Sequence, residues 1–301
     1  MSAHIRAASV AVIVLALTAC GLTTSSLPGV VRPPDQHTAI PVSMALRTPP
    51  DSAMNPMLRE RITYNGGKVQ RIPKIYVNYW GFNVSGRDPN GEQFYLTNFL
   101  EGIGGSTWLS DVTQYYEVLN GRRLHIQNNV GEMQGAWIDG TSIPLHPTDS
   151  QIQRAAKRLI THFGFHADAT YIVATPHGHN TQGFGTQFCT YHSALVGSGG
   201  AVAYVDFPYI SDAGAACFAN AVNGGQAGRL DGVSILAGGI IAETQTDPFI
   251  PFAFAWINPD GAEIGSDCTG LNLRDITFST GTFAIQGLWS DKRNLCSDSG
   301  P

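Results

Sequence analysis

Four side chains in the second half of the chain are of types that bind metal ions in proteins. Glu243 closes a long apolar run, and Glu263 and Asp267 follow it. Carboxylate oxygens of this kind can hold calcium without any other ligand type. His192 adds an imidazole nitrogen, which also suits zinc. These four are the candidate metal ligands. The expectation is nevertheless a chain without a resident cofactor or catalytic residues, with calcium or zinc as the ions such a site would take.

A second group of possible ligands lies near the middle of the chain. The run 170–175 predicts a strand, and His177 and His179 follow it, two residues apart. Two histidines at this spacing can chelate a metal, and His192 could join them on neighbouring loops. Together with Glu243 they would form a metal-dependent hydrolase site. The simpler interpretation is that His177 and His179 are exposed turn residues.

The apolar run that precedes Glu243 must position it. Val233–Ala242 is too short to cross a bilayer, which needs about 20 residues, so we predict a buried helix over residues 231–247, ended by Pro248. Gly238 and Gly239 lie inside this helix, and each costs about 1 kcal/mol relative to alanine. Their position must therefore matter more than helix propensity.

The remaining periodicity predicts a mixed α/β fold. Helical spacing and β-branched or aromatic runs alternate through the middle of the chain. We expect a single domain with a central sheet and flanking helices. The clearest expected elements are strands at 75–82, 170–175 and 201–207 and helices at 94–103 and 151–163.

Composition excludes one class of partner. The 301 residues are 43% hydrophobic and only 14% charged, with a formal net charge of −5. Nucleic-acid-binding proteins carry basic patches, and this chain has no basic cluster. We therefore expect no nucleic-acid partner.

The first residues have the layout of an export signal. His4 and Arg6 precede an apolar stretch at 7–17, and Leu17-Thr18-Ala19-Cys20 resembles a bacterial lipobox. This predicts a lipoprotein signal at 1–19 and lipid attachment to Cys20, which would anchor the protein in a bilayer. The alternative is an ordinary signal peptide with a chance cysteine.

The region after Cys20 predicts a tether and a location. Residues 20–60 contain Ser, Thr and Pro without a hydrophobic period, which is typical of a flexible linker. An anchored protein of this type belongs to the bacterial cell envelope. Gly21 follows the cysteine in place of an aspartate that retains enteric lipoproteins at the inner membrane, which favours the outer membrane or cell surface.

The four remaining cysteines predict disulfides. An even number of cysteines in an exported chain is typical of disulfide pairing. Proximity in the sequence favours Cys189–Cys217 and Cys268–Cys296, although four cysteines allow three connectivities. A four-ligand metal site is the alternative, but no Cys-x-x-Cys pair is present.

Several segments, in their order along the chain, resemble the EXORDIUM / phosphate-induced protein family of secreted proteins. The similarity covers roughly residues 60 to 298 and indicates one EXORDIUM-like domain over 61–298. The segments that carry it are Tyr64–Gly67, Tyr76–Trp80, Phe99–Ser106, Phe188–His192 and the helix at 230–249.

The resemblance also implies a degenerate zincin-like helix. Bacterial members often carry His-Glu-x-x-Glu before a Thr-Asp-Pro end, and aligned on that end the histidine falls on Gly239 and the general base on Ile240. Glu243 keeps the second ligand position, and Ala262–Cys268 resembles a later segment of the family. Glycine cannot bind a metal and isoleucine cannot move a proton, so the resemblance supports the fold and argues against the activity.

Three functions therefore stay open at this point. The first is a non-catalytic, membrane-anchored envelope lipoprotein that binds an unknown ligand. The second is a divergent metal-dependent hydrolase or peptidase using His177, His179 or His192 with Glu243. The third is a cell-wall or glycan-binding module that would use a set of aromatic side chains, namely Trp108, Tyr115, Tyr116 and Trp137.

Overall fold

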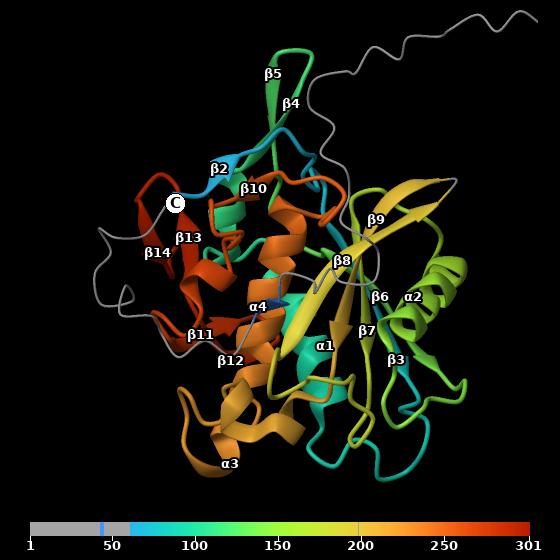
Figure 1. Cartoon of the computed structure of the whole chain (residues 1–301). Coiled ribbons are helices and arrows are strands. Elements are labelled where there is room, and N and C mark those ends of the chain that lie inside the picture. Colours follow the sequence, from blue (N-terminus) through green and yellow to red (C-terminus); the bar gives the residue numbers. More distant parts are fainter. Residues whose placement is uncertain (1–42, 45–60, 198) are drawn as a thin grey trace, which may run out of the picture.

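The structure, a computed structural model, describes residues 43–44, 61–197 and 199–301. Its centre is a six-stranded sheet in the order β1-β8-β9-β7-β3-β6, with helices packed on it (Figure 1). The expected single α/β domain with a central sheet and flanking helices is confirmed. The six strands are β1 (Ser43–Met44), β3 (Lys74–Trp80), β6 (Met133–Asp139), β7 (Ala169–Ala174), β8 (Thr190–Gly197) and β9 (Gly200–Phe207).

The sheet is mixed. Strands β9, β7, β3 and β6 are parallel, while β8 is antiparallel to β9 and β1 is antiparallel to β8. Parallel strands are usually covered on both faces and read as continuous apolar runs. All six residues of β7 are buried, as this rule requires.

Helices cover both faces of the sheet. α2 (Asp149–Phe163) packs on one face, where its apolar residues meet Tyr76 and Trp80 of β3. α1 (Glu92–Ile103) and α4 (Asp231–Thr246) pack on the other face, against Val77 of the same strand. Alternating side chains of β3 thus serve two cores, because successive strand residues point to opposite faces.

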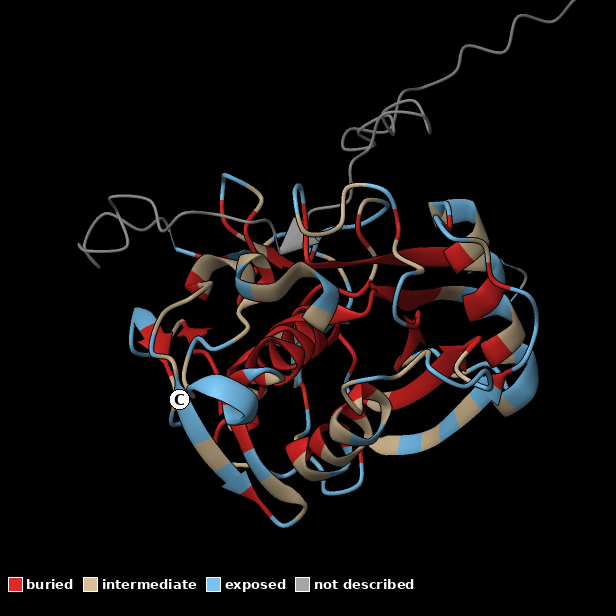
Figure 2. Cartoon of the chain, turned by 90° about the horizontal axis from the view of Figure 1, so that it is seen from below, coloured by how far each residue is buried: buried red, intermediate tan, exposed pale blue. Residues whose placement is uncertain are grey.

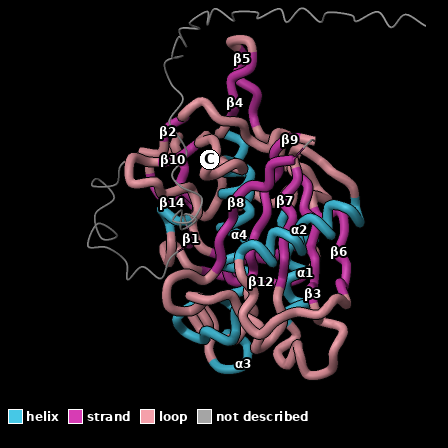
Figure 3. Tube along the Cα trace, turned by 45° about the vertical axis from the view of Figure 1, so that its right-hand side comes forward, coloured by secondary structure: helices cyan, strands magenta, loops and turns pink. Residues whose placement is uncertain are grey.

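The remaining elements are short and surround the helical face of the domain. The β4–β5 hairpin projects from the body of the domain (Figure 3). The short elements are β2 (Thr63–Tyr64), β4 (Tyr116–Leu119), β5 (Arg122–His125), β10 (Trp256–Ile257), β11 (Arg274–Phe278), β12 (Gly281–Ile285), β13 (Leu288–Ser290), β14 (Leu295–Ser297), α3 (Gly225–Gly228) and the 3₁₀ turns η3 (Leu109–Gln114), η4 (Ile210–Cys217) and η5 (Ser266–Cys268).

Helix α4 is the longest fully buried element among the described residues. All of its residues are buried, and Figure 2 shows it as a red helix among other elements. Two glycines, Gly238 inside the helix and Gly265 beside it, have steric reasons. A Cβ at Gly238 would lie 2.6 Å from the Trp108 ring, and a Cβ at Gly265 would lie 2.7 Å from the carbonyl oxygen of Gly239. The segment before η5 therefore lies directly on the helix backbone.

Most of the expected elements occur within one or two residues of their predicted ends. Two expectations need correction. His192 was expected on a loop, but it lies inside β8 because the strand that contains it is an antiparallel addition to the parallel sheet. Ser43–Met44, expected in the flexible tether, pair with β8 as β1. The rest of the tether, the signal at 1–19 and Cys20 lie outside the described residues.

Both cysteine pairs favoured by the sequence lie at disulfide distance. Cys189 and Cys217 are joined with a Cα–Cα distance of 5.6 Å, as are Cys268 and Cys296. The first disulfide connects the start of β8 to the end of η4. The second connects η5 to β14. Each therefore fixes a short, irregular element to its neighbours.

A side chain at position 238 should destabilise the domain. Gly238→Val places atoms against the buried Trp108 ring, and overpacking of this kind costs about 1–3 kcal/mol. Chemical denaturation should show this loss. Gly197→Val is the matched control, because nothing lies within 4 Å of a Cβ there; an equal loss in both variants would contradict the packing argument.

A buried carboxyl beside the end of α4 should make stability depend on pH. Glu132 accepts a hydrogen bond from Gln245 Nε2 (2.8 Å), and burial raises its pKa from 4.5 to about 8, although the bond from Gln245 lowers it. The folded state therefore holds a proton that the unfolded state releases. Its stabilising effect is complete below about pH 4.5 and is lost as the pH rises through about 8.

Glu132→Gln should flatten this decline. The amide keeps an oxygen for Gln245 but cannot ionise, so the free energy of unfolding should fall less between about pH 5 and about pH 8, by about 1 kcal/mol or more. Denaturation of both proteins at several pH values measures the difference. Identical pH slopes would show that Glu132 does not titrate in this range.

Candidate metal centre

Three side chains from separate elements meet inside the domain. His192 comes from β8, Glu243 from α4, and Glu263 from the segment just before η5. Each offers one ligand atom, and these atoms all lie within 4.8 Å of one another. The residues are 0%, 1% and 1% exposed, respectively. In the described part of the chain they form the one group of three or more residues with metal-binding geometry.

The distances within this group, named here the His192 cluster, are short. His192 Nε2 lies 2.9 Å from Glu263 Oε2 and 3.2 Å from Oε1. Two ligands bound about 2.1 Å from one tetrahedral ion would lie about 3.4 Å apart. The observed spacing thus fits a hydrogen-bonded pair and needs little change to fit two ligands of one ion.

Glu243 has a backbone partner in the segment that carries Glu263. The Ser266 N–H donates to Glu243 Oε1 at 2.5 Å. A Cβ at Gly265 would lie 3.0 Å from the same oxygen. Glycine at 265 therefore allows the loop to approach α4 closely enough to place Glu263 beside Glu243.

Asp247 is a third acidic group near the cluster. It follows Glu243 by one helical turn, and residues four apart share a helix face. Its Oδ1 accepts a hydrogen bond from the Ala255 N–H (2.7 Å). Asp247 Oδ2 and His192 Nδ1 are buried and have no hydrogen-bond partner among the described residues. Such atoms are costly in a protein interior unless an ion or water satisfies them.

Burial disfavours every charged form in the cluster. It raises the pKa of Glu243 to about 8, with a further rise from Glu263, and it raises the pKa of Glu263 and of Asp247 well above their usual values. Burial lowers the pKa of His192, which Glu243 and Asp247 raise in turn. Without a bound cation, these groups are therefore mostly uncharged at neutral pH.

The described residues place no lysine or arginine in an ion pair with any of these four groups. A buried carboxylate needs a compensating charge, and a protein supplies it with a basic side chain, a proton or a metal ion. Because no basic side chain among the described residues does so, protons or a divalent cation must supply this charge. The mixed nitrogen and oxygen donor set suits zinc or a similar transition metal better than calcium, which prefers oxygen alone.

Of the four ligands expected from the sequence, the structure brings three together. Asp267 is not a member of the group, and its Oδ1 instead accepts a hydrogen bond from Asn258 Nδ2 (3.4 Å). Its place next to the cluster is taken by Asp247, whose position in the sequence predicts only the end of a helix. The i,i+4 spacing of Glu243 and Asp247 on a buried helix was the signal that could have identified it.

The other two histidines do not belong to the cluster. His177 Nδ1 lies 2.5 Å from Asp212 Oδ1, and His179 Nδ1 lies 2.9 Å from the Pro144 carbonyl oxygen. Both follow β7 on a loop, as expected. Among the described residues, neither of them forms a group of possible metal ligands with Glu243.

Two of the four aromatic side chains that were expected to bind a ligand lie in the core instead. Trp108 and Tyr115 are fully buried, and their polar atoms donate to the carbonyl oxygens of Gln286 and Trp289. They belong to the core because η3, which separates them, packs against α4. Tyr116 and Trp137 are half-buried, and the Trp137 ring is stacked on His162 with centroids 4.6 Å apart.

The chain was compared with protein-family models, curated proteins and solved structures, and none of these matched. The resemblance to the EXORDIUM family stays a prediction from the sequence motifs. Function must be inferred from the geometry of the domain.

Proposed function

We propose that the chain is a lipid-anchored protein of the bacterial cell envelope, and that its domain is a non-catalytic binding domain stabilised by a divalent cation. His192, Glu243 and Glu263 hold this cation. The observation that supports the proposal is a group of three converging metal-ligand side chains, each at most 1% exposed, without a basic partner among the described residues.

Burial of the cluster favours a structural role over catalysis. Catalytic zinc keeps a coordination position open to water and substrate, whereas structural zinc is enclosed by protein ligands. A hydrolytic zinc site also needs a group that can accept a proton from bound water. Ile240, one turn before Glu243, is buried and apolar. A divergent hydrolase is therefore the weaker proposal.

A cation would also resolve the electrostatic problem of the core. Bound between the carboxylates, it would favour their ionised forms and supply the charge that the described basic residues do not. Asp247 Oδ2 and His192 Nδ1 are the orphaned atoms beside it. Such a site contributes its binding free energy to folding, because the unfolded chain has no preformed site.

Removing one ligand should weaken cation binding. Glu243→Gln keeps the shape and an oxygen for the Ser266 N–H, but it loses the charge. Zinc affinity of the purified protein, measured by competition with a chelating dye, should fall more than about 100-fold, beyond the effect of losing a supporting group. Asp267→Asn is the control. Unchanged affinity in Glu243→Gln, or metal-dependent peptidase activity of the parent, would contradict the proposal.

Cation binding should strengthen as the pH rises. The ligands must lose protons to bind, and burial raises the pKa of Glu243 to about 8. Zinc affinity should therefore increase from about pH 6 to about pH 8, in the direction opposite to the stability change expected for Glu132. Chelator competition at several pH values measures it; an affinity independent of pH would show that the bound ligands are already ionised.

Replacement of Cys20 tests the proposed lipid anchor. Cys20→Ser should abolish incorporation of labelled palmitate and move the protein from the membrane fraction to the soluble fraction. The serine hydroxyl cannot replace the Cys20 thiol as the site of lipid attachment. Ser26→Ala, a change in the same predicted tether, should leave both unchanged. Within the described residues no helix is long and apolar enough to span a bilayer. Membrane association that persists in Cys20→Ser would overturn the anchoring proposal.

A further inference from the structure

The loops that follow three parallel strands converge at one edge of the sheet. After β3 the chain continues to β6, on one side of the β7–β3 pair. After β7 it continues to β8 and β9, on the other side of this pair. Ligands of open α/β sheets bind outside the carboxyl ends of strands at such a switch point. The His177 N–H here donates to the Arg87 carbonyl oxygen after β3, and the Tyr209 N–H after β9 donates to Asn180 Oδ1.

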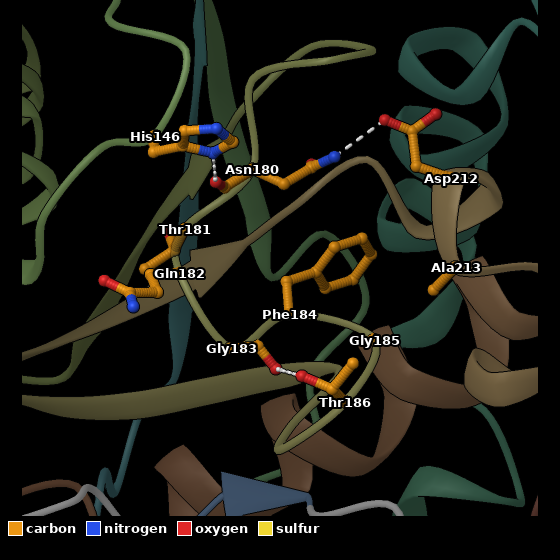
Figure 4. A pocket seen from close by; sticks show the side chains of 10 residues that line it. All are labelled: His146, Asn180, Thr181, Gln182, Gly183, Phe184, Gly185, Thr186, Asp212 and Ala213. Atoms are coloured by element: carbon orange, nitrogen blue, oxygen red, sulfur yellow. Dashed lines mark hydrogen bonds between the residues drawn. The ribbon is translucent and has the colours of Figure 1, made fainter.

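An open pocket of about 840 Å³ lies at this edge, between the loop that follows β7 and the start of η4. Its volume is in the range of small-molecule sites. Figure 4 shows the Phe184 ring projecting into the space between the loop and Asp212. The side chains used below are His146, Thr181, Gln182, Phe184 and Asp212.

The two walls of the pocket are held in place. Asp212 Oδ1 contacts His177 Nδ1, and Oδ2 accepts hydrogen bonds from the Gly178 N–H (2.8 Å) and Asn180 Nδ2 (2.7 Å). The Cys189–Cys217 disulfide joins the end of the same loop to the end of η4. A pocket fixed in this way avoids part of the ordering cost of binding.

Polar side chains lie in and beside the pocket. The Thr181 hydroxyl is buried and lies next to the buried carboxyl of Asp206. Burial raises the pKa of the neighbouring Asp206 to about 7, while the Thr181 hydroxyl lowers it, so a second buried polar group lies beside the first. Gln182 is exposed. The Gln182 amide can donate and accept hydrogen bonds without carrying a charge.

The charges argue against an anionic ligand. None of the residues that line the pocket is a lysine or arginine, and Asp212 contributes a carboxylate to its wall. The backbone N–H groups of Phe184, Gly185 and Thr186 all donate to carbonyl oxygens of the same loop. They do not form a cradle for phosphate, which needs free N–H groups.

We propose that this pocket binds a neutral saccharide, with an apolar sugar face on the Phe184 ring and sugar hydroxyls on the Gln182 amide. A sugar presents an apolar C–H face and a rim of hydroxyl groups, which is the pattern of the pocket. His146 Nδ1 is held near the Asn180 carbonyl oxygen (3.2 Å), which orients its ring at the edge. The site lies apart from Trp108 and Tyr115, which are buried in the core.

This inference rests on the binding role proposed above but not on the cation. The pocket shares no residue with the His192 cluster. Saccharide binding that survives chelator treatment would separate the two proposals. Zinc binding without any saccharide binding would leave the cation site and overturn only the pocket.

The test is a binding measurement on the purified protein with fluorescently labelled neutral oligosaccharides. The probes are β-1,4-linked N-acetylglucosamine, glucose and mannose oligomers, with inorganic phosphate as the anionic probe. Phe184→Ala should weaken binding at least 10-fold. Because Phe184 also packs against the core, the exposed Gln182→Ala serves as a second variant and should weaken binding several-fold without affecting folding.

Phe94→Ala is the matched control, since Phe94 is 74% exposed and lies at a different pocket beside Trp137. Binding of one oligosaccharide that is weakened in Phe184→Ala and Gln182→Ala and retained in Phe94→Ala supports the proposal. Binding lost in Phe94→Ala, unchanged in Gln182→Ala, restricted to phosphate, or undetected for every neutral probe at millimolar concentration overturns it.

Discussion

The burial of acidic groups around helix α4 is the constraint on which the rest of the domain depends. Glu243 lies on a helix with no exposed residue, and Glu263 and Asp247 lie close to it. Isolated carboxylates cannot stay charged in such surroundings. The interior must therefore hold protons or a cation at this place, where His192 from β8 meets Glu243 and Glu263.

Close backbone approach makes this arrangement possible. Gly265 lies against the Gly239 carbonyl oxygen, and Gly238 leaves room for the Trp108 ring. Larger residues at these points would separate the Glu263 loop or Trp108 from the helix. The cluster and the core packing thus share one physical requirement. The pocket at the carboxyl edge of the sheet is built independently, by Asp212 and the Cys189–Cys217 disulfide.

The sequence indicated the fold and much of the cluster because both leave local signals. Apolar periodicity identified α4, and three of the four candidate ligands meet around it. Asp247 was missed because Thr-Asp-Pro is also an ordinary helix ending. The Asp212 contacts were not predictable, since His177 and Asp212 are distant in sequence and meet only through the strand order. Burial of Trp108 and Tyr115 likewise depends on long-range packing that has no sequence period.

Metal analysis of the purified protein tests whether the His192 cluster holds a cation. Elemental analysis with X-ray absorption at the metal edge would report both stoichiometry and ligands. We expect about one transition-metal ion per chain, bound by one imidazole and carboxylate oxygens, and lost in Glu243→Gln. A protein free of metal after purification without chelators, and unable to take up zinc at about pH 8, would show that protons alone neutralise the cluster.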